Sequence, residues 1–165
     1  MKKMISAVAL ALSLSLAFGY APAVSRADKP AQSEMAAYQR EGFETRMEHG
    51  RLWVFIPGSK DLAKYDKAGE LAKHVVRPGK GPGGITIKGP DAETIDAYML
   101  ARPGFITRME HGRLWVFKSG SLELAKFEKA GELAKHVVRP GKGPGGITVK
   151  APDAETLDAY LAIVN

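Results

Sequence analysis

The sequence predicts an α+β fold built by tandem duplication, in which a unit of about 60 residues with the element order ββαββα occurs twice. Three observations predict it. Residues 42–98 match residues 104–160 without a gap, and 47 of these 57 positions are identical. Each copy has a His-Gly pair between two apolar stretches, as a hairpin requires. Each copy also has two segments whose apolar residues recur at helical spacing.

The hairpin is predicted over residues 43–55, with the His-Gly pair at 49–50 as a two-residue turn. Such a turn needs positive φ at both central positions, which Gly adopts freely and His tolerates better than most residues. In this register Arg46 lies opposite Trp53, close enough for a cation–π contact.

The rest of the unit follows from cap and turn residues. In order, we expect a helix between Ser59 and Gly69, a strand over 71–77, a glycine-rich loop, a strand over 85–88 and a helix beginning at Asp91. Two copies predict an antiparallel sheet with helices packed on one side. Only Arg102, Pro103 and Gly104 connect the copies, which is too short for a flexible tether. We therefore expect one pseudo-twofold body.

The N-terminal residues 1–27 have the features of a cleavable signal peptide. Lys2 and Lys3 precede an apolar stretch over residues 4–18, and small residues lead up to Ala27. The apolar stretch is short for a membrane span, and no second one follows. We expect cleavage after Ala27, location in the periplasm or outside the cell, and no transmembrane segment in the mature chain.

The mature chain is expected to comprise three parts: an N-terminal segment with a short helix at 28–41, repeat 1 at 42–102 and repeat 2 at 103–165. The whole chain has 24 basic and 18 acidic residues, a net charge of +6. Residues 1–27 hold three basic residues and no acidic one, so the mature chain has 21 against 18, or +3. This small excess argues against nucleic-acid binding. The absence of cysteine excludes disulfides, thiol nucleophiles and iron–sulfur clusters.

An arginine–aromatic face is the first candidate site. Its residues are Arg46, Trp53 and Phe55 in repeat 1, and Arg108, Trp115 and Phe117 in repeat 2. Exposed aromatic residues framed by arginine are typical of interaction hot spots. The alternative is that the aromatic side chains are buried against a helix or the sister repeat, with arginine stems at the edge.

The glycine-rich loop is the second candidate. Its backbone N–H groups could bind an anion, with Arg77 and Lys80 in repeat 1, and Arg139 and Lys142 in repeat 2, supplying charge. It is not a Walker loop, because a strand rather than a helix follows. The alternative is a purely structural hairpin loop.

The histidines are the third candidate, at His49, His74, His111 and His136. In an exported chain with methionines and no cysteine they suggest copper, which imidazole and thioether both ligate. The alternative gives His49 a turn role and His74 a place among buried side chains.

The sequence assigns no catalytic residue and predicts no cofactor, because no catalytic spacing is present. Our leading hypothesis is an exported, non-enzymatic binding or assembly module for an unidentified protein or a small anionic ligand. The near-identical copies also allow self-association. The first alternative is a periplasmic metal-handling protein of the copper type. The second is a small pseudo-dimeric enzyme with its site between the repeats.

Overall fold

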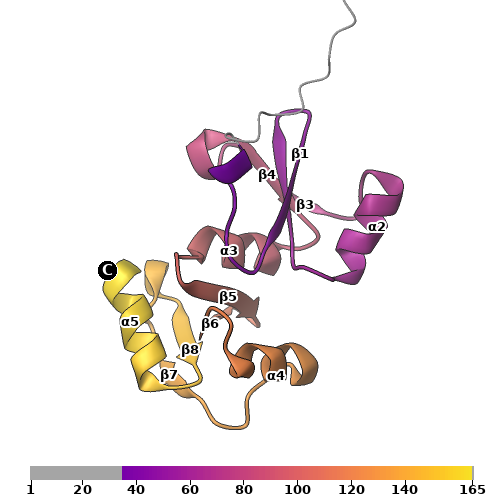
Figure 1. Cartoon of the computed structure of the whole chain (residues 1–165). Coiled ribbons are helices and arrows are strands. Elements are labelled where there is room, and N and C mark those ends of the chain that lie inside the picture. The colour runs from indigo at the N-terminus through magenta and orange to yellow at the C-terminus, as the bar shows by residue number, and fades with distance from the viewer. Residues whose placement is uncertain (1–34, 165) are drawn as a thin grey trace, which may run out of the picture.

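The computed structural model describes residues 35–164 and shows two similar α+β units (Figure 1). The expected signal peptide and residues 28–34 lie outside the described residues. Repeat 1 contains β1 (Glu44–Glu48), β2 (Arg51–Phe55), α2 (Lys60–Ala68), β3 (Val75–Arg77), the 3-10 turn η1 (Pro82–Gly84), β4 (Thr86–Gly89) and α3 (Ala92–Leu100). Repeat 2 contains β5 (Phe105–Glu110), β6 (Arg113–Lys118), α4 (Leu122–Ala130), β7 (Val137–Arg139), η2 (Pro144–Gly146), β8 (Thr148–Ala151) and α5 (Ala154–Val164). The α+β class and the duplication are therefore confirmed.

The hairpin has the predicted register. β1 and β2 are antiparallel, with Arg46 opposite Trp53 and Glu48 opposite Arg51. His49 has a φ of 48°, the positive value that the turn requires. The local chemistry of the turn thus sets which side chains of the hairpin share a face.

The helix caps also lie where the sequence predicts them. The Ser59 side chain accepts a hydrogen bond from the backbone N–H of Leu62, and Asp91 accepts one from Thr94. Gly69 has a φ of 78° and ends α2 in the left-handed conformation that Gly adopts without strain.

Each sheet is mixed rather than antiparallel, which corrects one detail of the prediction. The strand order is β1-β2-β4-β3, and β2 pairs with β4 in parallel. The chain leaves β2, crosses through α2, forms β3 at the sheet edge and returns as β4 in the interior. The strand expected over 71–77 begins only at Val75, because Leu71 packs into the cluster beneath α2.

The helices cover both faces of each sheet, which corrects the expectation of one covered side (Figure 1). Leu52 and Val54 pack with Ile95 and Tyr98 of α3. Their neighbours on β2 point to the opposite face, where they pack with α2. Because β2 is apolar on both faces, each face needs its own helix.

The repeats are arranged head to tail, not as a pseudo-twofold pair. The Tyr98 hydroxyl donates to the carbonyl of Tyr38 at 2.7 Å, and the Tyr160 hydroxyl donates to that of Leu100 at 2.8 Å. Both members of the second pair lie 62 residues after those of the first. The end of α3 therefore occupies in repeat 2 the place that the segment before β1 occupies in repeat 1. A twofold interface would also pair Arg46 with Gly104 as Arg108 pairs with Gly42, whereas the hydrogen bonds of Arg46 go to Glu44 and Thr45.

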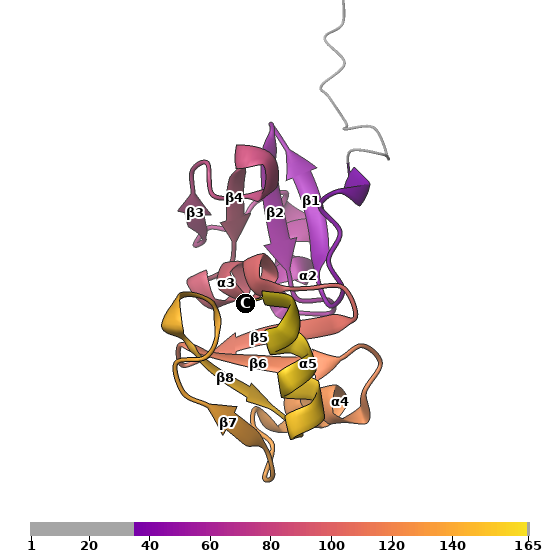
Figure 2. The ribbon, with the colours of Figure 1, turned by 90° about the vertical axis from the view of Figure 1, so that its left-hand side faces the viewer.

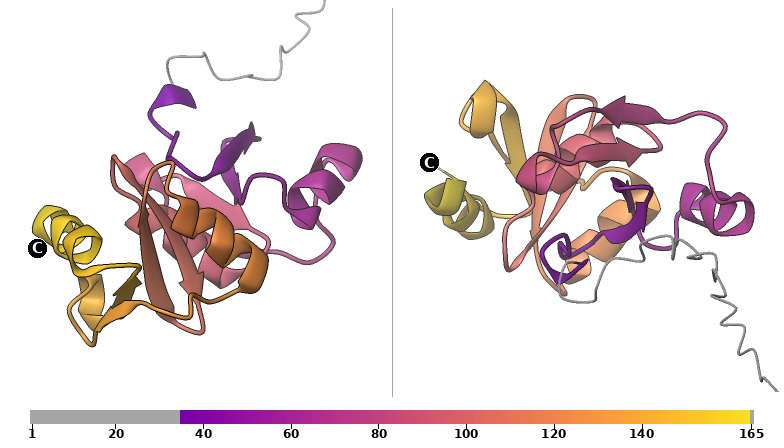
Figure 3. Two further views of the ribbon diagram at one scale, coloured as in Figure 1. Left: turned by 60° about the horizontal axis from the view of Figure 1, so that its bottom comes forward. Right: turned by 90° about the horizontal axis from the view of Figure 1, so that it is seen from above.

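This arrangement places α3 between the two sheets (Figure 2) and leaves α2 and α5 at opposite ends of the molecule (Figure 3). Ala97 on α3 is only 1% exposed, whereas its counterpart on α5, Ala159, is exposed. One helix of the pair is thus covered by the other repeat. Among the described residues, no helix is long and apolar enough to cross a membrane.

Candidate interaction surfaces

The aromatic residues of the arginine–aromatic face are inside the repeats. Trp53 and Phe55 have no exposed surface and pack beneath α2 with Leu62 and Tyr65. In repeat 2, Trp115 and Phe117 are buried in the same way beneath α4. Of the two interpretations, the structure therefore shows the burial against a helix.

The cation beside Trp53 is Lys88, which the sequence analysis missed. Its Nζ lies 4.3 Å from the Trp53 ring centroid and 2.8 Å from a carboxylate oxygen of Glu70. The hydrogen bond from Lys88 lowers the pKa of Glu70. His74 packs against the same indole in a tilted orientation, with ring centroids 4.9 Å apart. Lys88 lies opposite Trp53 in the parallel β2–β4 pair. Its position could be predicted only from that pairing, which the pattern of a hairpin does not specify.

Repeat 2 has the same cluster. Lys150 lies over Trp115 at 4.7 Å and bonds Glu132, and His136 packs against the indole in a tilted orientation. In both repeats the lysine is nearly buried while its carboxylate partner is exposed. The lysine and histidine thus cover the indole, and the carboxylate partner of the lysine remains exposed at the surface.

The glycine-rich loops direct most of their polar groups inward. The N–H groups of Lys80, Gly81 and Gly84 donate to carbonyls of the same loop or the strands beside it. Arg77 forms an ion pair with Asp96 of α3, and Arg139 forms one with Asp158 at 3.7 Å. Only the exposed Lys80 and its counterpart Lys142 extend from the loops without an ion pair among the described residues. A loop that uses its own donors offers few of them to an anion.

The four histidines lie in two settings. His49 and His111 are exposed at the hairpin turns, at φ values of 48° and 50°. His74 and His136 pack against tryptophans, with Nδ1 2.8 and 2.9 Å from the carbonyl oxygens of Leu71 and Leu133. Within residues 35–164, no three His, Asp or Glu side chains come together as a metal site.

One surface of repeat 2 is a docking surface for repeat 1. We call it the β5–α4 face and define it by Ile106, Arg108 and Glu128. Arg108 donates from Nη1 to the carbonyl of Gly42 at 3.1 Å and from Nη2 to Glu128 at 2.5 Å. Ile106 lies directly against Gly42, where even a methyl group would collide with it. The Arg108 side chain is 7% exposed in this contact.

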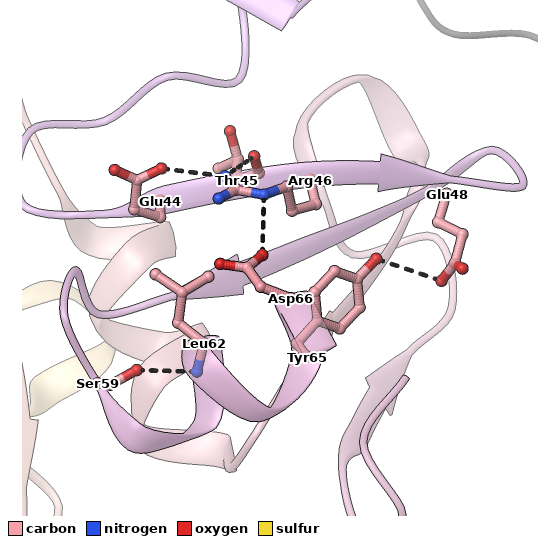
Figure 4. A network of polar contacts seen from close by, with 8 residues as sticks. All are labelled: Glu44, Thr45, Arg46, Glu48, Ser59, Leu62, Tyr65 and Asp66. Carbon is pink, nitrogen blue, oxygen red and sulfur yellow. Dashed lines mark hydrogen bonds and ion pairs between the residues drawn. The ribbon is translucent and has the colours of Figure 1, made fainter. Parts of the chain in front are cut away.

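The equivalent surface of repeat 1 is open. We call it the β1–α2 face and define it by Glu44, Arg46 and Asp66. Arg46 bridges the other two, with Nη1 3.0 Å from Glu44 and Nε 3.6 Å from Asp66 (Figure 4). Its side chain is 37% exposed, against 7% for Arg108. The arginine–carboxylate pair of this surface is thus present in both repeats, but only one copy is covered.

Two of the ten differences between the aligned repeats exchange an apolar for a charged residue at this junction. Ile106 of the covered face is replaced by Glu44 on the open one. Ile56, which lies beside Arg108 and Phe127 where the repeats meet, is replaced in repeat 2 by the exposed Lys118. The substitutions place apolar side chains where the surface is covered and charged side chains where it faces solvent.

A cavity of about 290 Å³ lies between the repeats, where an active site was one of the alternatives. Its polar lining includes Asp91, Glu93, Glu110 and Arg108. Asp91 caps α3, Glu93 accepts from the backbone N–H of Gly112, and Arg108 bonds Gly42 and Glu128. No histidine lines it. Two of its charged groups, Glu93 and Arg108, therefore join the repeats.

Comparisons with protein-family models, curated proteins and solved structures find no match for this chain.

Proposed function

We propose that the protein is an exported, non-enzymatic module that binds or assembles with another protein through the β1–α2 face of repeat 1. The observation that carries the proposal is the use of the same surface in repeat 2, where Arg108 and Ile106 hold the neighbouring repeat at Gly42. A surface that binds protein in one copy is open in the other.

The chemistry of the open face differs from that of the covered one. Glu44 replaces an isoleucine, and the side chains of Glu44, Asp66 and Arg46 are each more than a third exposed. A partner would present a backbone carbonyl for Arg46, as Gly42 does for Arg108, and a cationic side chain for the two carboxylates. Such a polar contact favours a reversible complex over a permanent one.

The proposed export depends on the pattern of residues 1–27. Mass measurement of the protein recovered from the periplasm or medium should give a chain that begins at Asp28. An uncleaved chain in the cytosol would rule out this part of the proposal without affecting the docking surface.

Site-specific photo-cross-linking tests the docking surface. A photoreactive residue at position 44 should give a discrete higher-mass adduct in cells, and Arg46→Ala should abolish it. The matched control carries the photoreactive residue at position 106, which repeat 1 covers, and should give only a cross-link within the chain. Equal adducts from position 44 and from an unrelated exposed site such as Lys135 would show that the face has no specific partner.

A further inference from the structure

A cavity of about 420 Å³ lies apart from the β1–α2 face. It is formed by the segment before β1, the end of α3 and the glycine-rich loop of repeat 1. Its lining residues include Arg40, Arg102, Tyr98, Met99 and Pro82. A cavity of this size is within the range of sites for small molecules.

Two arginines, each two residues before a copy of the duplicated segment, line this cavity. Arg40 and Arg102 are 62 residues apart, and each comes shortly before a hairpin. Arg40 donates from Nη1 to the carbonyls of Ala37 and Gln39, at 3.1 and 2.8 Å. Arg102 repeats this with the carbonyls of Met99 and Ala101, at 3.3 and 2.8 Å. Both guanidinium groups are thereby fixed by their own backbone.

These bonds use only Nη1 of each guanidinium. Within residues 35–164, the Nε and Nη2 atoms of Arg40 and Arg102 make no hydrogen bond, and no carboxylate forms an ion pair with either residue. The Nε–Nη2 edge is one that binds a carboxylate or phosphate with two parallel hydrogen bonds. The one acidic residue in the lining, Glu41, bonds the Ser119 hydroxyl and the Gly104 N–H.

The remaining walls of the cavity suit a small organic molecule. Met99 and Ala101 of the α3 end, with Pro82 and Pro103, provide apolar surface. Arg40 is also placed over the ring of Tyr98, with its guanidinium carbon 5.7 Å from the ring centroid. This contact supports the orientation of Arg40 without using its remaining donors.

We propose that this cavity is a binding site for a small organic dianion, either a dicarboxylate or a phosphate ester, held between Arg40 and Arg102. Two fixed guanidinium groups match two negative charges, and the apolar walls contact the body of the molecule. The proposal does not depend on the protein-docking role of the β1–α2 face, which lies elsewhere on the molecule and uses other residues.

Titration calorimetry of the purified chain tests the site with succinate and inorganic phosphate as probes, and with sodium chloride at matched ionic strength as the control. We expect saturable binding of one or both probes with a dissociation constant of about millimolar or tighter. Binding of succinate alone would identify a dicarboxylate site, and binding of phosphate alone would identify a phosphate-ester site. Binding of both would identify a site for either charge arrangement. No saturable binding at about 10 mM, or heats equal to those of chloride, overturns the proposal.

Single variants assign the binding to the two arginines. Arg40→Ala and Arg102→Ala should each weaken binding at least about tenfold, because each loses a charge-assisted bidentate contact. Arg40→Lys should also weaken it, since lysine keeps the charge but not the planar fork. The exposed Arg51 lies outside the lining, so Arg51→Ala should change affinity less than about twofold and serves as the matched control. Thermal melting without ligand checks that each variant folds. Undiminished binding by the folded Arg40→Ala/Arg102→Ala double variant overturns the proposal.

Discussion

The Tyr160 hydroxyl donates a hydrogen bond to the carbonyl oxygen of Leu100 at 2.8 Å, which joins the core of repeat 2 to the last turn of α3. Tyr160 is fully buried, and Leu100 packs against the same hydrophobic cluster. A residue of the first repeat thus completes the core of the second. The same bond in repeat 1 uses Tyr38, which precedes the duplicated segment.

Removal of this hydroxyl should destabilise the fold measurably. Tyr160→Phe leaves the Leu100 carbonyl without its donor and should lower the free energy of unfolding by about 1 kcal/mol. Tyr65→Phe is the matched control, because the Tyr65 hydroxyl lies 3.4 Å from Glu48 and repeat 2 already has phenylalanine at the equivalent position. Urea unfolding of both variants measures the difference. Equal effects would contradict the role of the Tyr160 bond.

Alkaline pH should unfold the protein through ionisation of Tyr98 and Tyr160. Burial raises the pKa of Tyr98 and of Tyr160 from 10.0 to about 12. The folded state then holds these protons more tightly than the unfolded state, so stability is complete below pH 10 and falls as pH rises towards 12. Unfolding free energy and phenolate absorbance, measured across this range, should change together. Ionisation of these tyrosines near pH 10 in a protein that stays folded would contradict it.

Neither repeat should be a stable monomer as an isolated fragment. Residues 103–165 lose the Leu100 carbonyl that Tyr160 requires, and we expect this fragment to be unfolded. Residues 28–102 retain the Tyr38 carbonyl but expose Ala97, so this fragment should form a dimer or be largely unfolded. Circular dichroism and light scattering distinguish these states. A monomeric fragment as stable as the whole chain would show that the repeats fold independently.

Truncation of a buried tryptophan should be severe. Trp53→Ala leaves a cavity between β2 and α2 and should cost about 3–5 kcal/mol. Leu122→Ala is the control, because Leu122 is 73% exposed and its loss should change stability by less than about 0.5 kcal/mol. Fluorescence of the intact protein should show emission shifted to short wavelength and weak quenching by iodide. Emission like that of indole in water would mean that the tryptophans are exposed.

Local chemistry made the hairpin and the helix caps predictable. The positive φ of His49 and the caps at Ser59 and Asp91 depend on residues within a few positions of each other. The parallel pairing of β2 with β4 joins segments more than 30 residues apart, and no local signal specifies it. The prediction of an antiparallel sheet covered on one side failed for this reason.

The candidate-site residues show the same difference between local contacts and tertiary contacts. The burial of Trp53 was one of two interpretations that its strand allowed, whereas the position of Lys88 over its ring required the tertiary pairing. The cavity with Arg40 and Arg102 depends on tertiary packing, because the segment before β1 lies against the end of α3. Neither arginine has a sequence context that distinguishes it from a solvent-exposed charge.

The divergence between Ile56 and Lys118 predicts that exchanging isoleucine and lysine is costly in repeat 1 and nearly neutral in repeat 2. Ile56 lies at the junction beside Arg108 and Phe127, so Ile56→Lys brings a charge next to a buried guanidinium and removes apolar contact. We expect a loss of about 1–2 kcal/mol in the free energy of unfolding. Lys118 is half exposed and pairs with Glu155, so Lys118→Ile should change stability by less than about 0.5 kcal/mol.

The double exchange, Ile56→Lys with Lys118→Ile, keeps the composition of the chain and isolates the effect of position. It should unfold at lower urea concentration than the native chain, because it moves the apolar side chain from the junction between the repeats to a solvent-exposed position. The exposed isoleucine at position 118 should also make its apparent size by light scattering rise with concentration. An exchanged chain with native stability would mean that the junction between the repeats contributes little to the fold.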